Sequence, residues 1–202
     1  RNTPENIEFI YEALRWLGLD WDGEPISQVS RTERHQEVLA ELVERGQVYR
    51  TNAKGDDVKA WKAEHGAEKG YRGSDEGEGA YRLRVPDEGE TVVHDLIRGD
   101  TTFRHDHLDD PVIARGDGRV LYNFAVAVDD LDAGITHVIR GEDHLSNTPK
   151  QLLVFEAMGW EPPVYAHIPL IYGPDGKKLS KRHGAVSVQE FRDKGILPEA
   201  MR

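Results

Sequence analysis

The chain has 202 residues, a formal net charge of −11 and no cysteine. Its length suits one large domain or two small ones. Without cysteine it can form neither disulfides nor cysteine-ligated zinc sites, which fits a cytoplasmic protein. No apolar run approaches the roughly 20 residues of a membrane helix, so no membrane partner is expected. The acidity argues against a surface that coats nucleic acid everywhere, although it is compatible with a local basic groove.

Two helices are predicted in the first 50 residues. Thr3 followed by Pro4 is typical of an N-cap and a first helical position, and apolar residues continue at helical spacing to Leu17. Gly18 then stands where a helix commonly stops. A second helix is expected to begin at a capping box formed by Ser30 and Glu33. Its apolar stripe comprises Val38, Leu39, Leu42 and Val43. Both stripes are expected to face a core.

Residues 50–115 are predicted to form a mostly β insertion with some helix. Alternating residues at 81–85 predict a strand, and residues 91–97 are its expected partner across a tight turn. Gly116-Asp117-Gly118 predicts the turn of a second hairpin.

The last third of the chain has the pattern of an α/β unit. Residues 135–139 predict a buried strand, a helix follows from about Thr148, and residues 165–172 predict the next strand. Strands of such a unit are parallel, and ligands bind beyond their carboxyl ends. The polar residues 140–144 and the glycine-bounded loop 173–182 follow these two strands directly. We therefore expect both segments on one ligand-binding edge.

The loop contains a cationic run, Lys178-Leu179-Ser180-Lys181-Arg182. Cleavage between the α and β phosphates of ATP builds charge on the departing pyrophosphate. An ammonium group near a ligand edge can meet that charge in the transition state, and the Ser180 hydroxyl can add a donor. A solvated basic loop is the alternative interpretation. No Gly-x-x-x-x-Gly-Lys-Ser/Thr sequence is present, which excludes a P-loop ATPase.

Arg140 stands at the end of a predicted strand, where a guanidinium suits the bidentate capture of a carboxylate. The Tyr122 hydroxyl can serve the same ligand. In the alternative interpretation, Arg140 merely pairs with a neighbouring acid: Asp129, Asp130 or Glu142. Two groups of histidines and acids, at residues 142–144 and 105–110, lack the ligand spacing of a structural zinc site. We therefore expect no metal held by the protein, and Mg²⁺ would arrive with ATP.

Three ordered motifs resemble those of bacterial glutamyl-tRNA synthetases, which are class I aminoacyl-tRNA synthetases. The first motif is similar to the family's first helix and following turn, and it reads Leu14-Arg15-Trp16-Leu17-Gly18-Leu19-Asp20-Trp21-Asp22. The second motif runs from Tyr122-Asn123-Phe124-Ala125 through Val128-Asp129-Asp130 to a continuous segment. That segment is His137-Val138-Ile139-Arg140-Gly141-Glu142-Asp143-His144-Leu145-Ser146-Asn147-Thr148-Pro149-Lys150-Gln151. The third motif resembles the family's form of the Lys-Met-Ser-Lys-Ser signature, and it reads Lys178-Leu179-Ser180-Lys181-Arg182-His183-Gly184. The resemblance spans the chain and is weakest over residues 51–80.

This resemblance implies a nucleotide site beside an amino-acid pocket. The ATP phosphates would be contacted by Lys181, Lys178 and Ser180. The rest of the ATP site would be bordered by Asp143, His144, Leu170 and Ile171. Glutamate would be held by Arg140, Tyr122 and Arg1. The reaction would activate L-glutamate with ATP and Mg²⁺ to glutamyl-adenylate and then esterify tRNA(Glu), without zinc and as a monomer.

The resemblance also implies an α/β fold: an incomplete Rossmann-like parallel sheet with an inserted α+β connective domain. Residues 1–49 would begin the catalytic domain without its first strand, and residues 50–115 would form the insertion that grips the tRNA acceptor end. Residues 116–186 would complete the catalytic domain, and residues 187–202 would start the stem-contact domain. Because no His-Ile-Gly-His-like signature is found, we expect a fragment that cannot form the adenylate alone.

Three alternatives stay open at this point. A paralogue of the glutamyl-Q tRNA(Asp) synthetase type would share the catalytic motifs. Glutaminyl-tRNA synthetase is disfavoured, because its signature loop usually lacks the Arg182-His183-Gly184 continuation. A non-catalytic module that binds a nucleotide or tRNA is the alternative from a different functional class.

Overall fold

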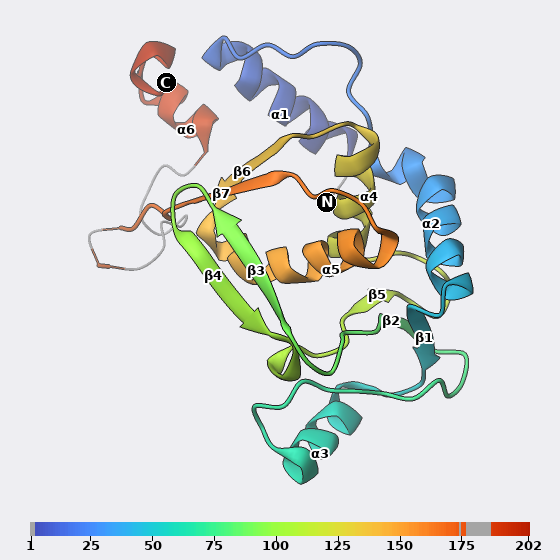
Figure 1. The fold of residues 1–202 in the computed structure, drawn as a ribbon. Helices are drawn as coiled ribbons and strands as arrows, with labels where there is room; N and C mark the ends of the chain where they lie inside the picture. Colours follow the sequence, from blue (N-terminus) through green and yellow to red (C-terminus); the bar gives the residue numbers. More distant parts are fainter. Residues whose placement is uncertain (1–2, 174, 177–186) are drawn as a thin grey trace. The chain divides into compact units, whose positions relative to one another are not determined.

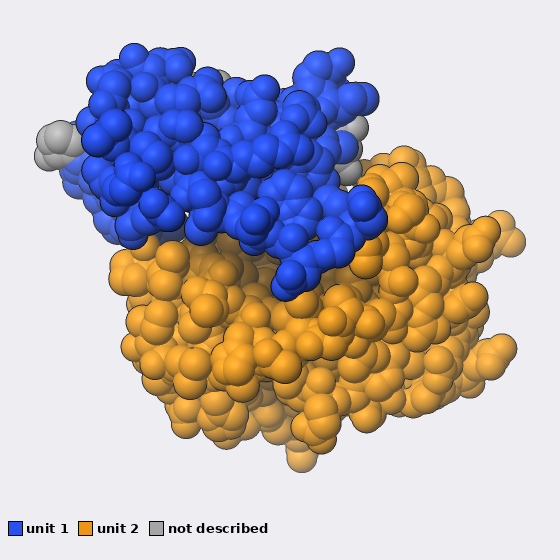
Figure 2. Space-filling view, turned by 90° about the horizontal axis from the view of Figure 1, so that it is seen from above, with its two compact units in different colours: residues 1–25, 170–202 blue, residues 26–169 orange. Residues whose placement is uncertain are grey.

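The structure, a computed structural model, describes residues 3–173, 175–176 and 187–202. The chain forms two compact units, which Figure 2 colours separately. Unit 1 comprises residues 1–25 and 170–202, and unit 2 comprises residues 26–169. The boundaries between these units differ from the predicted domain boundaries. The predicted domains, which rest on function as well as on structure, stay a prediction. No helix among the described residues is long and apolar enough to span a membrane.

Unit 1 contains the helices α1 (Pro4–Leu17) and α6 (Val188–Asp193) and the 3-10 helix η5 (Pro198–Ala200). The predicted ends of α1 are confirmed. The Thr3 side chain accepts a hydrogen bond from the Asn6 amide, and Gly18 closes the helix in the left-handed conformation at φ 66°. The predicted burial of the α1 stripe is wrong, because no residue of α1 is buried. The other described helices of unit 1 have only 6 and 3 residues, which is too few to enclose this stripe.

A four-stranded sheet forms one side of unit 2 (Figure 1). Its strands, in spatial order, are β4 (Gly99–Arg104), β3 (Glu90–Asp95), β7 (Val164–Ile168) and β6 (His137–Gly141). Strands β6 and β7 are parallel and joined through α5 (Thr148–Met158), which confirms the predicted α/β unit. The predicted burial of β6 is wrong. As an edge strand it leaves Ile139 68% exposed, and β7 ends at Ile168 rather than at residue 172.

A smaller antiparallel sheet joins β1 (Val48–Thr51), β2 (Ala80–Leu83) and β5 (Val112–Ala114) in that order, with α3 (Gly55–His65) between β1 and β2 in sequence. The predicted pairing of residues 81–85 with residues 91–97 is wrong, because these segments lie in different sheets. Pro86 has no N–H with which to prolong β2. Strand β3 instead pairs with β4 across a turn in which the Asp95 carboxylate accepts from two backbone amides.

The core of unit 2 lies where α2 (Thr32–Glu44), α4 (Tyr122–Asp132) and α5 pack together against the smaller sheet. Its largest fully buried apolar members include Leu42, Leu83, Phe124, Val128 and Phe155. The predicted capping box of α2 is wrong. Ser30 belongs to the 3-10 turn η1 (Gln28–Arg31) and donates to the Ser27 carbonyl. The start of α2 is instead held to α4, because the Asp129 carboxylate contacts both Arg31 and His35.

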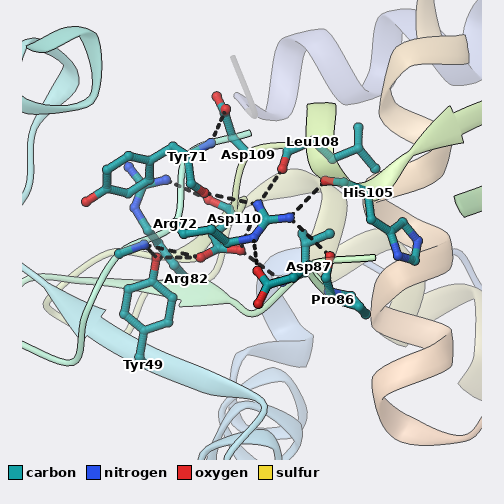
Figure 3. Close-up of polar contacts among 12 residues, drawn as sticks. Tyr49, Tyr71, Arg72, Arg82, Pro86, Asp87, His105, Leu108, Asp109 and Asp110 are labelled. Carbon is teal, nitrogen blue, oxygen red and sulfur yellow. Dashed lines mark hydrogen bonds and ion pairs between the residues drawn. The ribbon is translucent and has the colours of Figure 1, made fainter. Parts of the chain in front are cut away.

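A polar cluster holds the loops around β2 and β5 together (Figure 3). The guanidinium of Arg72 donates to four backbone carbonyls, those of Leu108 (2.7 Å), His105 (2.8 Å), Pro86 (3.1 Å) and Tyr71 (3.3 Å). The buried Asp110 carboxylate accepts from the Tyr49 hydroxyl at 2.8 Å and the Val85 amide at 2.9 Å. Burial raises the pKa of Asp110, and these hydrogen bonds oppose the rise. The cluster thus fixes loops from separate parts of the sequence against one another.

Candidate active site

Arg140 lies in β6, one residue before the strand ends, and its side chain is half-buried. The guanidinium donates through Nε to His167 Nε2 (3.1 Å) and through Nη2 to Thr148 Oγ1 (2.9 Å) and Gln151 Oε1 (3.0 Å). Each partner accepts with a lone pair, so none supplies a compensating negative charge. Within the described part of the chain, no carboxylate forms an ion pair with Arg140.

Of the three acids near Arg140 in sequence, two pair with other residues. Asp129 pairs with a histidine and an arginine at the start of α2, and Glu142 pairs with Arg98. Burial raises the pKa of Asp130, and the positive charge of Arg140 opposes that rise without a direct ion pair. The interpretation in which Arg140 merely pairs with one of these acids is therefore wrong. A half-buried guanidinium without a carboxylate partner is an arrangement suited to an anionic ligand.

His167 in β7 is fully buried between Arg140 and Asp95, the last residue of β3. Its Nδ1 lies 2.6 Å from Asp95 Oδ2. Asp95 also accepts from the amides of Ile97 (3.0 Å) and Arg98 (2.9 Å). Burial alone would raise the pKa of Asp95, but the hydrogen bonds outweigh burial and lower it to about 2. Asp95 is thus a carboxylate at neutral pH, and it reaches Arg140 only through the ring of His167.

Tyr165 lies against the guanidinium, with its ring centre 5.4 Å from Arg140 Cζ. The side chain is buried, and its hydroxyl has no hydrogen-bond partner among the described residues. Burial raises the pKa of Tyr165 to about 12, while the charge of Arg140 opposes the rise and Asp130 and Tyr122 add to it. Arg140, Asp130 and Tyr122 therefore all lie within electrostatic reach of this one hydroxyl.

A chain of amide side chains connects Gln151 with an aromatic pair. The Gln151 amide donates to Asn123 Oδ1 at 3.2 Å, and the Asn123 amide donates to Asn147 Oδ1 at 3.4 Å. The Asn147 amide then donates to Nδ1 of His144 at 3.2 Å. The ring centre of His144 is 6.0 Å from that of Tyr122. The structure thus brings together two residues that sequence analysis assigns to different substrates, Tyr122 to glutamate and His144 to ATP.

The other predicted site residues fall in three places. Asp143 is exposed in η3 (Glu142–Asn147), which follows β6. Leu170 is half-buried and Ile171 is 73% exposed, and both belong to unit 1. Outside the described residues lie Arg1, Lys178, Ser180 and Lys181.

Sequence reasoning missed the polar residues that surround Arg140. Thr148 and Gln151 reach it from the first two turns of α5, and His167 reaches it from β7. A signal existed for His167, because a histidine inside a buried strand needs a hydrogen-bond partner. Nothing comparable marks Asp95, which lies 72 residues from His167 in sequence.

Three of the histidines and acids in residues 105–110 bond to other parts of unit 2: His105, Asp109 and Asp110. The His105 ring contacts the Thr91 hydroxyl at 2.9 Å and the Glu88 carbonyl at 3.0 Å. Among the described residues, no three His, Cys, Asp or Glu side chains gather closely enough to hold a metal ion. The expected absence of zinc stays a prediction.

A protein-family model described as the catalytic domain of class I tRNA synthetases (E and Q) matches residues 1–202. The chain belongs to this family. Glutamate–tRNA ligase 2 of Rhodospirillum centenum is 48% identical to it over 215 residues, which cover 100% of this chain and 46% of that protein. Glutamate–tRNA ligase 1 of Acidithiobacillus ferrooxidans is 48% identical over 213 residues, with the same coverage. This class I domain thus spans less than half the length of the curated relatives it matches.

A solved structure has the same fold. It is a glutamate tRNA ligase from Elizabethkingia meningosepticum in complex with its amino acid, and it is 30% identical with a TM-score of 0.82. The match covers 98% of this chain and 50% of that chain. The class I α/β fold expected from the sequence, and the family resemblance carried by the three motifs, are both confirmed.

Proposed function

We propose that the protein is a glutamate–tRNA ligase. It joins L-glutamate and ATP into glutamyl-adenylate with release of pyrophosphate, and then esterifies the 3′ end of tRNA(Glu) with release of AMP. The observation that carries the proposal is the half-buried guanidinium of Arg140, which has only lone-pair partners among the described residues. The similarity to glutamate–tRNA ligases supports the same choice of substrate.

Arg140 binds the side-chain carboxylate of glutamate. A guanidinium is always charged and has five donors, of which Nε and both hydrogens of Nη2 are already used here. Both hydrogens of Nη1 have no partner among the described residues and are left for a ligand. Charge favours a carboxylate there over the neutral amide of glutamine. The Tyr122 hydroxyl completes the pocket, and we assign Arg1 to the same ligand.

The ATP phosphates are bound by the cationic run, with Lys181 as the main contact and Lys178 and Ser180 assisting. Their positive charge stabilises the negative charge that grows on pyrophosphate as the bond between the α and β phosphates breaks. Mg²⁺ enters as the ATP complex, since it is usually held largely by phosphates and water. The nucleotide is bordered by Asp143, His144, Leu170 and Ile171.

Residues 50–115 grip the acceptor end of tRNA(Glu) as the connective insertion. We assign the protein to the cytoplasm, where its three substrates meet, and we expect it to act as a monomer without zinc.

The test is aminoacylation by the full-length protein with radiolabelled glutamate, glutamine or aspartate on tRNA(Glu) and on tRNA(Asp). We expect charging only with glutamate on tRNA(Glu), and loss of that activity in Arg140→Gln. Glutamylation of tRNA(Asp) alone would instead identify the glutamyl-Q type of paralogue. Binding of ATP and a glutamyl-adenylate analogue, measured by titration calorimetry, separates the enzyme from a module without a nucleotide site.

A further inference from the structure

We propose that His167 and Asp95 are positioning residues that hold the guanidinium of Arg140 ready for the carboxylate of the amino-acid substrate. This inference rests on the proposed function for its substrate, and on the hydrogen bonds of the described residues for its geometry. Neither residue needs to touch the substrate, because both act through Arg140.

The contacts of His167 determine which of its nitrogens carries the proton. Nε–H of Arg140 can only donate, so His167 Nε2, 3.1 Å away, accepts with its lone pair. The proton of the neutral ring is then on Nδ1, which donates to Asp95 Oδ2 at 2.6 Å. The Thr148 hydroxyl, 3.2 Å from Nε2, completes the surroundings of that nitrogen.

The carboxylate of Asp95 is held in place by backbone amides as well as by the ring of His167. The Asp95 carboxylate accepts from the amides of Ile97 and Arg98 in the turn that links β3 to β4. It also accepts from the backbone amide of His167 at 3.0 Å, so the side chain and the backbone of that residue are held by one group. The ring of His167 therefore has one orientation, and that orientation points its lone pair at Arg140.

The interposed ring also keeps two opposite charges apart. If a small side chain replaced His167, the buried carboxylate of Asp95 and the guanidinium of Arg140 could pair directly. Such a pair would neutralise Arg140 and draw it away from its ligand position. The neutral ring is oriented by the Asp95 carboxylate and in turn orients the guanidinium of Arg140. The charge of Arg140 stays available for the substrate.

Three variants of the full-length protein separate the two hydrogen bonds of the ring. In Asp95→Asn, the new amide group donates to Nδ1 of His167, so the ring proton moves to Nε2. The Nε2–H group then faces the Nε–H of Arg140 and can no longer accept from it. An aspartate-to-asparagine change in a catalytic triad imposes the wrong tautomer in the same way. His167→Asn keeps a donor for Asp95 but has no acceptor within reach of Arg140. His167→Gln places an amide oxygen near the position of Nε2 and keeps that acceptor.

We expect Asp95→Asn and His167→Asn to raise KM for glutamate by on the order of tenfold or more, with KM for ATP within about twofold of wild type. His167→Gln should recover most of the loss. The matched control is His105→Gln, which alters another buried histidine, the residue directly after β4, whose ring contacts the Thr91 hydroxyl and the Glu88 carbonyl instead. Equal effects of Asn and Gln at position 167, or a comparable KM rise in His105→Gln, would mean a general structural role and overturn the proposal.

A spectroscopic measurement keeps this inference distinct from the proposed function. In protein labelled with ¹⁵N-histidine and without substrates, His167 should show a protonated Nδ1 and an unprotonated Nε2, and the two should exchange roles in Asp95→Asn. A protonated Nε2 in the wild type overturns the positioning role whatever the activity. If wild type charges no glutamate although the nitrogen signature holds, the proposed function fails and the geometry stands. If wild type charges glutamate and both substitutions leave KM unchanged, the function stands and the positioning role fails.

Discussion

The guanidinium of Arg140 lies against the ring of Tyr165, whose buried hydroxyl has no partner among the described residues. A buried hydroxyl without a partner costs about 1–3 kcal/mol. Tyr165→Phe removes that cost and keeps the ring, so we expect the free energy of unfolding to rise by about 1 kcal/mol. Urea titration followed by fluorescence measures the change.

Tyr49→Phe is the matched control for this substitution. Tyr49 is equally buried, but its hydroxyl donates to Asp110 at 2.8 Å and accepts from the Gly73 amide at 3.0 Å. We expect its loss to destabilise the fold by about 1–3 kcal/mol, because it leaves buried groups unpaired. A clear loss of stability in Tyr165→Phe as well would show that the Tyr165 hydroxyl has a partner, such as bound water.

A second prediction concerns the charge and the shape of Arg140. Arg140→Lys keeps a positive charge but replaces the planar group that bonds His167, Thr148 and Gln151. We expect kcat/KM for glutamate to fall by on the order of 100-fold in Arg140→Lys and further in Arg140→Gln, with KM for ATP little changed. Steady-state aminoacylation measures both constants. Arg31→Lys, at an ion pair with Asp129, is the control and should leave kcat/KM within about threefold.

Asp95 gives a third prediction, on acid stability. Its pKa is lowered from 3.8 to about 2, so the folded state favours the ionised form. That stabilisation is fully present above pH 4 and is lost as the pH falls towards 2. At about 1.4 kcal/mol per pKa unit this lowering amounts to about 2.5 kcal/mol. Wild type should therefore exceed Asp95→Asn in free energy of unfolding by about this amount at pH 6, and the difference should shrink towards pH 2.

Asp110 is an internal control, because its pKa is shifted in the opposite direction to that of Asp95. Burial raises its pKa, so the folded state takes up a proton more readily than the unfolded chain. The stability of wild type relative to Asp110→Asn should therefore fall as the pH rises above 3.8. Unfolding measured at several pH values distinguishes the two trends, and equal trends for Asp95 and Asp110 would contradict the assignment.

Local signals explain what could be predicted of the fold. The Thr3 cap, the Gly18 stop and the β6–α5–β7 unit depend on residues close together in the chain, and the structure has all three. The pairing of β3 was predicted incorrectly because partner choice is a non-local property. Strand β3 lies between β4 and β7, and β7 follows about 70 residues later in sequence.

The same limit applies to the site. Arg140 could be singled out because a cation at a strand end is visible in sequence. The role of Arg140 could not be decided there, because the competing acids at 129, 130 and 142 are all near neighbours in sequence. Only the coordinates show Asp129 and Glu142 paired with other residues and Asp130 without a direct ion pair to Arg140. Asp95 and His167 have no shared sequence pattern, and only the parallel pairing of β3 with β7 places them together.

Arg72 gives the last prediction, on the polar cluster of Figure 3. Its planar guanidinium donates to the carbonyls of His105 and Leu108, on the segment after β4, and to that of Pro86, on the segment after β2. A lysine ammonium cannot reach three carbonyls in these directions at once, so Arg72→Lys leaves acceptors unpaired. We expect a loss of about 2–3 kcal/mol in the free energy of unfolding and faster hydrogen exchange at the amides of these loops. Arg104→Lys, which alters an exposed pair with Asp106, should change stability by less than about 1 kcal/mol. Equal effects of the two substitutions would show that the Arg72 bonds contribute no more than a surface ion pair.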